Sequence, residues 1–130
     1  MFSDPFFRDM AWDVLFHGDV EDEFADFSEL VQDELLAHAE LLATLGPQLK
    51  RPRADTLKGS RHANMKELRF EADDGVSRSA FAFDPARRAI LLVAGDKSGQ
   101  SQKRFCRRLI VKADARFDAH LAGLETKGGR

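Results

Sequence analysis

The fold is decided by residues 65–94, which read MKELRFEADDGVSRSAFAFDPARRAILLVA. The segment contains three stretches in which large apolar residues alternate with polar ones or run together, a pattern typical of β-strands. Asp-Gly at 74–75 and Asp-Pro at 84–85 separate these stretches, and both dipeptides favour tight turns. The segment therefore predicts consecutive antiparallel strands at 65–72, 76–83 and 89–94.

Successive side chains of a strand point to opposite faces of its sheet. Leu68, Phe70 and Phe81 then belong to one face, and we expect them to pack under helices. Arg69 and Arg78 belong to the other face. If the helices cover only the apolar face, both arginines project from an exposed sheet surface.

The residues before this segment predict a short strand at 12–16 and two helices. Asp19 is a candidate N-cap for the first helix, which runs through Phe27. Ser28 can cap the second helix, whose apolar residues recur at steps of three and four. Gly46 followed by Pro47 ends it.

The other segments are polar or amphipathic. Residues 48–63 are rich in Lys and Arg and show no apolar period, so they predict a basic loop. Residues 95–99 predict a second polar loop, and 100–121 predict a helix with several basic residues.

The predicted order is β-α-α-β-β-β-α. It indicates an α+β domain with a mainly antiparallel four-stranded sheet and the helices on one face. A length of 130 residues suits a single domain spanning 1–130. We expect residues 1–10 and 122–130 to be frayed.

Composition limits the class of protein. One cysteine, Cys106, excludes an intramolecular disulfide and a multi-cysteine zinc site. No apolar run approaches the roughly 20 residues of a membrane span, and the first ten residues lack the pattern of a secretory signal. The expectation is a cytoplasmic protein.

Charge is distributed unevenly along the chain. Residues 1–49 contain twelve acidic residues and one arginine, a net charge of −11, whereas residues 50–130 contain nineteen basic and ten acidic residues, a net charge of +9. Clustered Lys and Arg attract polyanions. The alternative is that these charges only solvate helix faces.

Three segments carry a resemblance to a known family: LKGSRHANMKELRF at 57–70, VSRSAFAFDP at 76–85 and LLVAGDKSG at 91–99. Together with the Trp12 strand, they resemble the HigB-like branch of the RelE/ParE toxins of bacterial toxin–antitoxin systems. The resemblance implies the compact microbial ribonuclease-type fold, ribosome-dependent cleavage of mRNA, and an antitoxin of the HigA or Xre-like helix-turn-helix type.

The resemblance also implies site residues. Arg78 matches the arginine that binds the scissile phosphate in the family, and Arg69 matches the arginine that ends a Leu-Arg pair on the preceding strand. Lys97 falls where the family has a basic residue near the site. A guanidinium suits this role because its planar fork can bind phosphate oxygens in pairs. Alternatively, Arg69 pairs with Glu67 or Glu71.

Further basic residues are candidates for binding the backbone of mRNA or ribosomal RNA rather than for chemistry. They are Lys58, Arg61 and His62 in the basic loop, and Lys103, Arg104 and Arg107 in the last helix. The last helix is equally compatible with a docking surface for an acidic antitoxin, or with solubility alone.

The residue that transfers protons is left open. The RelE prototype uses a tyrosine on its final helix, and this sequence contains no tyrosine. The candidates are His62, His120, Glu67 or a lysine with a lowered pKa. His120 resembles the C-terminal histidine that some HigB-type toxins use, although it could instead interact with the helix dipole. His38, on the apolar stripe of its helix, is expected to be structural.

Attack by the 2′-hydroxyl of RNA requires a base, cations around the phosphorus and an acid, so no metal or cofactor is expected. Two alternatives remain. One is a ParE-like poison of DNA gyrase, since that part of the superfamily does not cut RNA. The other is a non-catalytic nucleic-acid or partner-binding module.

Overall fold

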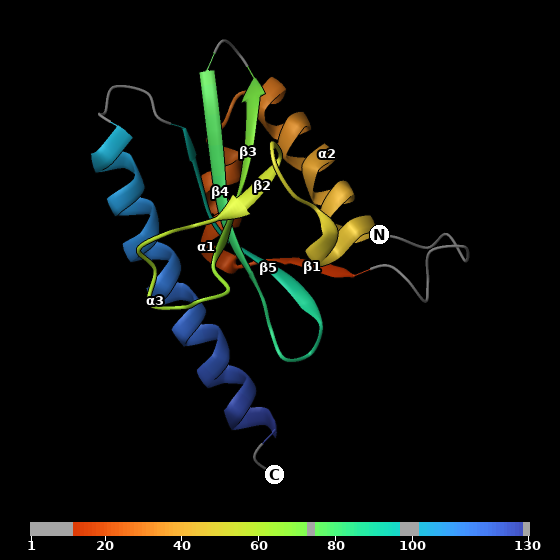
Figure 1. Ribbon diagram of the computed structural model, residues 1–130, viewed down its shortest axis with the longest axis vertical. Helices are drawn as coiled ribbons and strands as arrows, with labels where there is room; N and C mark the ends of the chain where they lie inside the picture. The colour runs from red at the N-terminus through yellow and green to blue at the C-terminus, as the bar shows by residue number, and fades with distance from the viewer. Residues whose placement is uncertain (1–11, 73–74, 97–101, 129–130) are drawn as a thin grey trace.

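The computed structural model describes residues 12–72, 75–96 and 102–128. The elements, in order, are β1 Asp13–Phe16, α1 Gly18–Ala25, α2 Glu29–Leu45, the 3-10 turn η1 Gly46–Gln48, β2 Ala54–Thr56, β3 Lys66–Ala72, β4 Gly75–Phe83, β5 Arg88–Asp96 and α3 Gln102–Gly128 (Figure 1). The predicted α+β order is confirmed. One strand was missed, because β2 lies within the stretch expected to be a loop.

The five strands form one sheet in the order β1-β5-β4-β3-β2. Three of the strand pairs are antiparallel: β2–β3, β3–β4 and β4–β5. The fourth pair, β1–β5, is parallel, with Val14 opposite Ala89. β4 is therefore central. β2 was missed because three residues are too few to show an alternating pattern.

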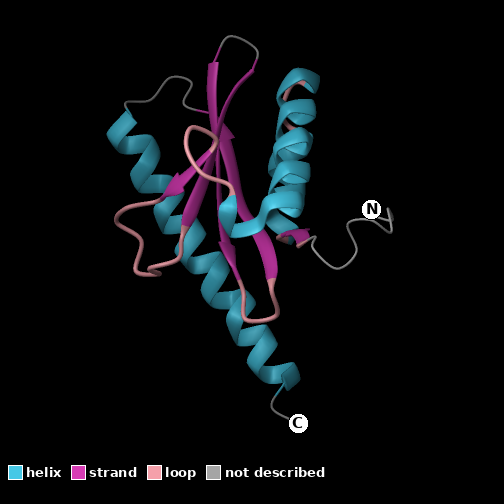
Figure 2. Cartoon of the chain, turned by 45° about the vertical axis from the view of Figure 1, so that its right-hand side comes forward, coloured by secondary structure: helices cyan, strands magenta, loops and turns pink. Residues whose placement is uncertain are grey.

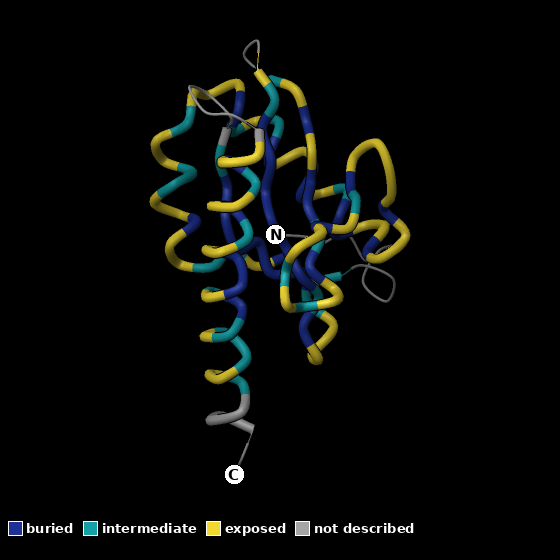
Figure 3. Tube along the Cα trace, turned by 60° about the vertical axis from the view of Figure 1, so that its left-hand side comes forward, coloured by how far each residue is buried: buried dark blue, intermediate teal, exposed yellow. Residues whose placement is uncertain are grey.

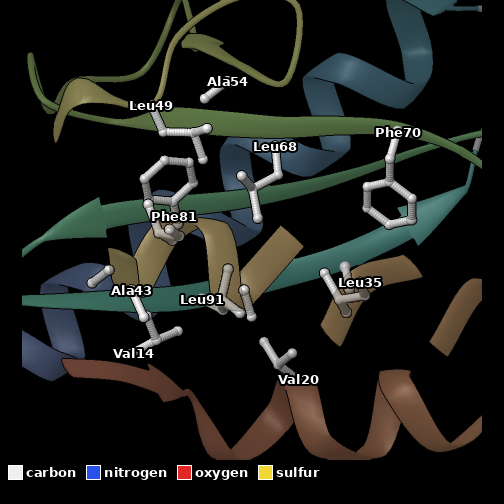
Figure 4. Packing of buried hydrophobic residues seen from close by; sticks show 14 of the residues in the cluster. Val14, Val20, Leu35, Ala43, Leu49, Ala54, Leu68, Phe70, Phe81 and Leu91 are labelled. Carbon is white, nitrogen blue, oxygen red and sulfur yellow. The ribbon is translucent and has the colours of Figure 1, made fainter. Parts of the chain in front are cut away.

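α1 and α2 cover one face of the sheet. Ser28 caps α2 as predicted, and its Oγ accepts a hydrogen bond from the backbone N–H of Val31. α1 begins two residues earlier than expected, because His17 rather than Asp19 is its N-cap. A core cluster joins α2, through Leu35, to Phe81 on β4 (Figure 4).

α3 covers the opposite face, which corrects the prediction of a single helical layer. Figure 2 shows the sheet between α3 and α2. A second core cluster joins Leu109, Ala113 and Phe117 of α3 to Ala80 and Ala82 of β4. Buried and exposed residues alternate along α3, as the period of an amphipathic helix requires (Figure 3). α3 also extends to Gly128, beyond its predicted end at residue 121.

None of the described helices is sufficiently long and apolar to cross a membrane.

A bulge in β5 lets this strand serve both cores. Ala80 pairs with Val93 but the next residue, Phe81, pairs with Leu91, so Leu92 is an extra residue. The bulge changes which face each following side chain occupies. As a result Val93 joins Leu92 in the α3 core, and Gly95 lies on the α3 face beside its partner Arg78.

β1 ends before β5 does, and polar side chains cover the edge of β5 beyond it. The backbone N–H of Ala94 donates to Glu23 Oε1 at 3.1 Å, and the carbonyl of Leu92 accepts from Arg116 Nη1 at 2.8 Å. Glu23 and Arg116 also pair with each other at 2.9 Å. This contact satisfies edge groups of the sheet and joins α1 to α3.

The β4–β5 turn is held to α3 through Asp84. Its carboxylate accepts hydrogen bonds from the Ala86 and Arg88 backbone, from the Arg88 guanidinium and from His120 Nε2 at 2.8 Å. A carboxylate only accepts, so Nε2 of His120 is the protonated nitrogen. Burial raises the pKa of Asp84, but the hydrogen bonds from His120 and Arg88 outweigh it and hold the pKa below 3.8.

Asp84→Asn should lower the free energy of unfolding by about 2 kcal/mol at pH 7, because a buried acceptor with charged donors is lost. A carboxyl group whose pKa is lowered on folding stabilises the chain above its unfolded pKa. That stability is lost as the pH falls through the folded pKa. The difference in the free energy of unfolding between wild type and Asp84→Asn should therefore shrink below pH 3.8. Urea unfolding across pH measures it, with the exposed Asp33→Asn as control.

Candidate functional site

The two predicted arginines face each other across neighbouring strands. Arg69 on β3 pairs in register with Arg78 on β4, so both side chains lie on the same face of the sheet. This part of the prediction is confirmed. The face is the one that α3 covers, however, and the two side chains differ greatly in exposure.

Arg78 is buried, which corrects the expectation that it projects into solvent. Its side chain is 7% exposed. Nη1 lies 2.9 Å from Cys106 Sγ, and the guanidinium carbon lies 5.9 Å from the centre of the Phe105 ring. The first turns of α3 therefore cover Arg78. Phe105 packs beside Gly95, where a Cβ would lie in ordinary contact with the ring at 3.5 Å.

Glu67 is the anionic member of the cluster. Its side chain is 6% exposed, and its Oε1 accepts from Arg69 Nη2 at 3.3 Å. Oε2 lies 3.6 Å from Arg78 Nη1 and has no hydrogen-bond partner among the described residues. Oε2 thus lies beside the Arg78 guanidinium with unused capacity to accept a hydrogen bond.

Arg69 is the accessible member, with a side chain that is 50% exposed. α3 crosses β4 and β5, where it covers Arg78, but it does not cover the outer part of β3. We call Arg69, Arg78 and Glu67 the arginine–glutamate cluster. It brings two cations and one carboxylate together on rigid strands.

The two candidate histidines lie elsewhere. His120 bonds Asp84, and His62 Nε2 lies 2.8 Å from Asp118 Oδ1. The Phe117 ring contacts both imidazoles, at centroid distances of 4.9 Å from His62 and 6.3 Å from His120. Along α3, His120 is fourteen residues after Cys106, or roughly 21 Å at 1.5 Å per residue. In this arrangement His120 lies apart from Arg78, and its catalytic role stays a prediction.

The candidate RNA-binding residues divide into two groups. Arg61 and His62 are tied to α3, because Arg61 pairs with Asp114 and Asp118 and His62 pairs with Asp118. The remaining candidates have exposed side chains, on the loop or on the first turns of α3: Lys58, Lys103, Arg104 and Arg107. Lys97 lies outside the described residues.

A groove beside β3 was not predicted. It has a volume of about 330 Å³ and lies between α2, the segment before β2, and the end of β3. Its lining residues are Glu34, His38, Pro52, Arg53, Arg69, Phe70, Glu71 and Val76. Only Arg69 had been assigned to a site. The sequence signal was weak, because these residues come from four separate segments.

The described residues include no group of three His, Cys, Asp or Glu side chains placed to hold a metal ion.

Comparisons with known proteins give the family. The model of phage-derived Gp49-like proteins (DUF891) matches residues 22–118. Two Mycobacterium tuberculosis (strain ATCC 25618 / H37Rv) proteins are similar. "Putative toxin HigB2" is 47% identical over 93 residues, 70% of this chain and 45% of that protein. "Putative toxin HigB3" is 48% identical over 91 residues, 69% of this chain and 75% of that protein.

The fold is also similar to that of the toxin RelE of E. coli, solved in the free state as a double arginine-to-alanine mutant. The TM-score is 0.58, with 12% sequence identity, 79% of this chain covered and 97% of RelE. At that identity, the likeness concerns the fold alone. On the family match and the two relatives, the chain belongs to the Gp49-like family of phage-derived proteins, a HigB-like branch of the RelE/ParE superfamily.

Proposed function

We propose that this chain is the toxin of a type II toxin–antitoxin system and cleaves mRNA on the ribosome in the cytoplasm. The relatives named as toxins support the first part. The arginine–glutamate cluster supports the second, because it combines phosphate-binding cations with a group that can accept a proton. The observation that carries the proposal is that Glu67 lies between Arg69 and Arg78 and that its buried Oε2 has no hydrogen-bond partner among the described residues.

The proposed roles follow from exposure. Arg69 is half exposed and binds the scissile phosphate of the RNA, where it stabilises the charge that grows in the transition state. Glu67 accepts the proton of the attacking 2′-hydroxyl; the P–O5′ bond breaks, a 2′,3′-cyclic phosphate forms, and the leaving 5′-oxygen takes its proton from water. Arg78 holds Glu67 in place and adds positive charge beside the phosphorus. Of the proton-transfer candidates weighed from the sequence, Glu67 is the one in contact with both arginines.

RNA must move the first turns of α3 to reach Glu67 and Arg78. In the arrangement described here, Phe105 and Cys106 cover Arg78, and Glu67 Oε2 is shielded from solvent. In this arrangement the proposed site is therefore closed to RNA. The exposed basic residues of those same turns, Lys103 and Arg107, are placed to bind the RNA backbone as the turns move.

A helix-turn-helix antitoxin completes the proposed system. The basic outer face of α3 suits an acidic partner segment as well as it suits RNA. An antitoxin bound there would keep the first turns of α3 over Arg78, which blocks the site without touching the reacting groups.

Arg69→Ala should fold normally but lose growth inhibition and RNA cleavage, because the accessible phosphate-binding cation is removed. We expect the cleavage rate to fall about 100-fold or more, the usual cost of losing one transition-state donor. Mapping new 5′ ends after induction in cells measures it. The control is Arg51→Ala, which removes an equal charge from an exposed pair with Asp55.

The same experiment separates the competing functions. Codon-phased cuts with the wild type and with Arg51→Ala, but not with Arg69→Ala, are the expected pattern. Growth inhibition accompanied by gyrase-trapped DNA breaks and intact mRNA would replace the proposal with gyrase poisoning. An Arg69→Ala chain with full activity would remove Arg69 from the site.

Glu67→Gln should reduce cleavage by about 100-fold or more while leaving RNA affinity nearly unchanged, because the amide keeps the shape but cannot accept the proton in the same way. A purely structural role for Glu67 would instead lower the free energy of unfolding and RNA affinity together. The pH–rate profile distinguishes the two. Its acidic limb should disappear in Glu67→Gln, and an unchanged profile would exclude Glu67 as the base.

A further inference from the structure

The β4–β5 turn displays a cation that the proposed cleavage does not use. Arg87 is exposed, and its guanidinium carbon lies over the Trp12 ring, 4.9 Å from the ring centre. The start of β1, the end of α2 and this turn meet here (Figure 1). Within residues 12–72, 75–96 and 102–128, the Arg87 guanidinium makes no ion pair and no hydrogen bond. Its N–H groups thus have no acceptor in this part of the chain.

The backbone conformation at Arg87 is one that favours glycine. The N–H of Arg87 donates to the carbonyl of Asp84 at 3.1 Å, and the N–H of Asp84 donates to the carbonyl of Arg88 at 2.8 Å. A three-residue hairpin loop of this kind usually ends in a left-handed residue, most often glycine. Arg87 holds this place with a φ of +63°. The left-handed conformation costs more than contact with a partly exposed ring stabilises, so folding alone does not explain an arginine here.

The Trp12 ring is held in place by its neighbours. The backbone N–H of Trp12 donates to the carbonyl of Ala43 at 2.6 Å, and its ring meets the Phe83 ring edge-on at 4.8 Å. Gly46 lies so close that a Cβ at this position would overlap the indole. Because these contacts exist without a ligand, the ring under Arg87 is preorganised.

This pair of side chains lies apart from the arginine–glutamate cluster. Arg78 is five residues before the end of β4 at Phe83, or roughly 17 Å at 3.4 Å per residue, and Arg87 lies beyond that end. Trp12 packs with Phe83 and the end of α2, on the side of the sheet opposite to α3. A nucleotide bound at Arg87 is therefore a different one from the nucleotide at the cleaved bond.

We propose that Arg87 and Trp12 bind one unpaired nucleotide of RNA outside the cleavage site. The base stacks on the outer face of the Arg87 guanidinium, since unpaired bases stack on aromatic rings and on guanidinium planes. The N–H groups at the edge of the guanidinium donate to a phosphate of the same strand. A nucleotide offers a flat ring and an anion together, whereas an acidic side chain offers only the anion. This inference rests on the proposed function in taking RNA as the ligand, but it does not require cleavage.

The test uses the fluorescence of Trp12, which is the only tryptophan in a chain without tyrosine. The Arg69→Ala chain, which lacks the phosphate contact of the cleavage site, is titrated with two six-residue 2′-O-methyl RNAs. One is hexaadenylate and the other is the same backbone without bases, and neither can be cut because the attacking hydroxyl is blocked. Hexaadenylate should quench Trp12 and bind about tenfold more tightly than the chain without bases, within the range of one stacked base.

Two variants at Arg87 separate a binding role from a role in the turn. Arg87→Gly should raise the Tm by about 3 °C, because glycine adopts the left-handed conformation without strain, and should lower the affinity for hexaadenylate about tenfold. Arg87→Lys keeps the charge but loses the planar face, so it should bind the two RNAs with nearly equal affinity. The control is Arg51→Ala, which removes an equal charge from an exposed pair with Asp55 and should leave both affinities unchanged.

The outcomes separate this inference from the proposed function. Unchanged hexaadenylate affinity in Arg87→Gly would overturn the inference, and a lower Tm would then show that the arginine only supports the turn. Quenching of Trp12 by a hexaglutamate peptide but not by hexaadenylate would overturn it in favour of an acidic protein partner. If hexaadenylate binds as expected and the wild type does not cut mRNA, the proposed cleavage is wrong and the RNA contact stands.

Discussion

Burial of β4 and β5 from both faces is the constraint on which the rest of this structure depends. Two apolar layers enclose these strands, one made with α1 and α2 and the other with α3. Polar groups placed in them have no access to water and must find partners inside the chain. Ser79 Oγ donates to the carbonyl of Val93 at 2.9 Å, and Arg78 is bound by Glu67 and Cys106. A charged cluster inside the sheet is therefore a consequence of covering Arg78 with α3.

The attachment of α3 differs along its length, and this difference is relevant to access. Its middle and later turns are joined by ion pairs and hydrogen bonds to α1, to the loop before β3 and to the β4–β5 turn, through Arg116, Asp114, Asp118 and His120. The contacts of its first turns include the packing of Phe105 beside Gly95 and the contact of Cys106 with Arg78. Moving only the first turns leaves the later contacts intact. Opening of the site is thus compatible with a folded core.

Local patterns in the sequence predicted most elements, because their causes are local. Alternation and the turn dipeptides indicated β3, β4 and β5, and Ser28 and Gly46 marked the ends of α2. The face that α3 covers could not be predicted, since a face is chosen by packing between distant segments. The bulge at Leu92 was hidden because a continuous aliphatic run has no alternation to break. Strand alternation correctly placed Arg69 and Arg78 on one face of the sheet, whereas the burial of Arg78 depends on where α3 packs and could not be predicted for the same reason. The roles of these arginines and of the histidines stay predictions.

Arg69 links the buried cluster to the surface, and this position limits how the site can work. Its guanidinium contacts the buried Glu67, and its side chain is 50% exposed to solvent. A phosphate bound to Arg69 competes with Glu67 for the same donors, since a guanidinium has a fixed number of N–H groups. Binding of substrate would therefore loosen Glu67 from Arg69 and leave it held by Arg78 alone. In the mechanism that we propose, the cation that binds the phosphate therefore also releases the carboxylate that accepts the proton.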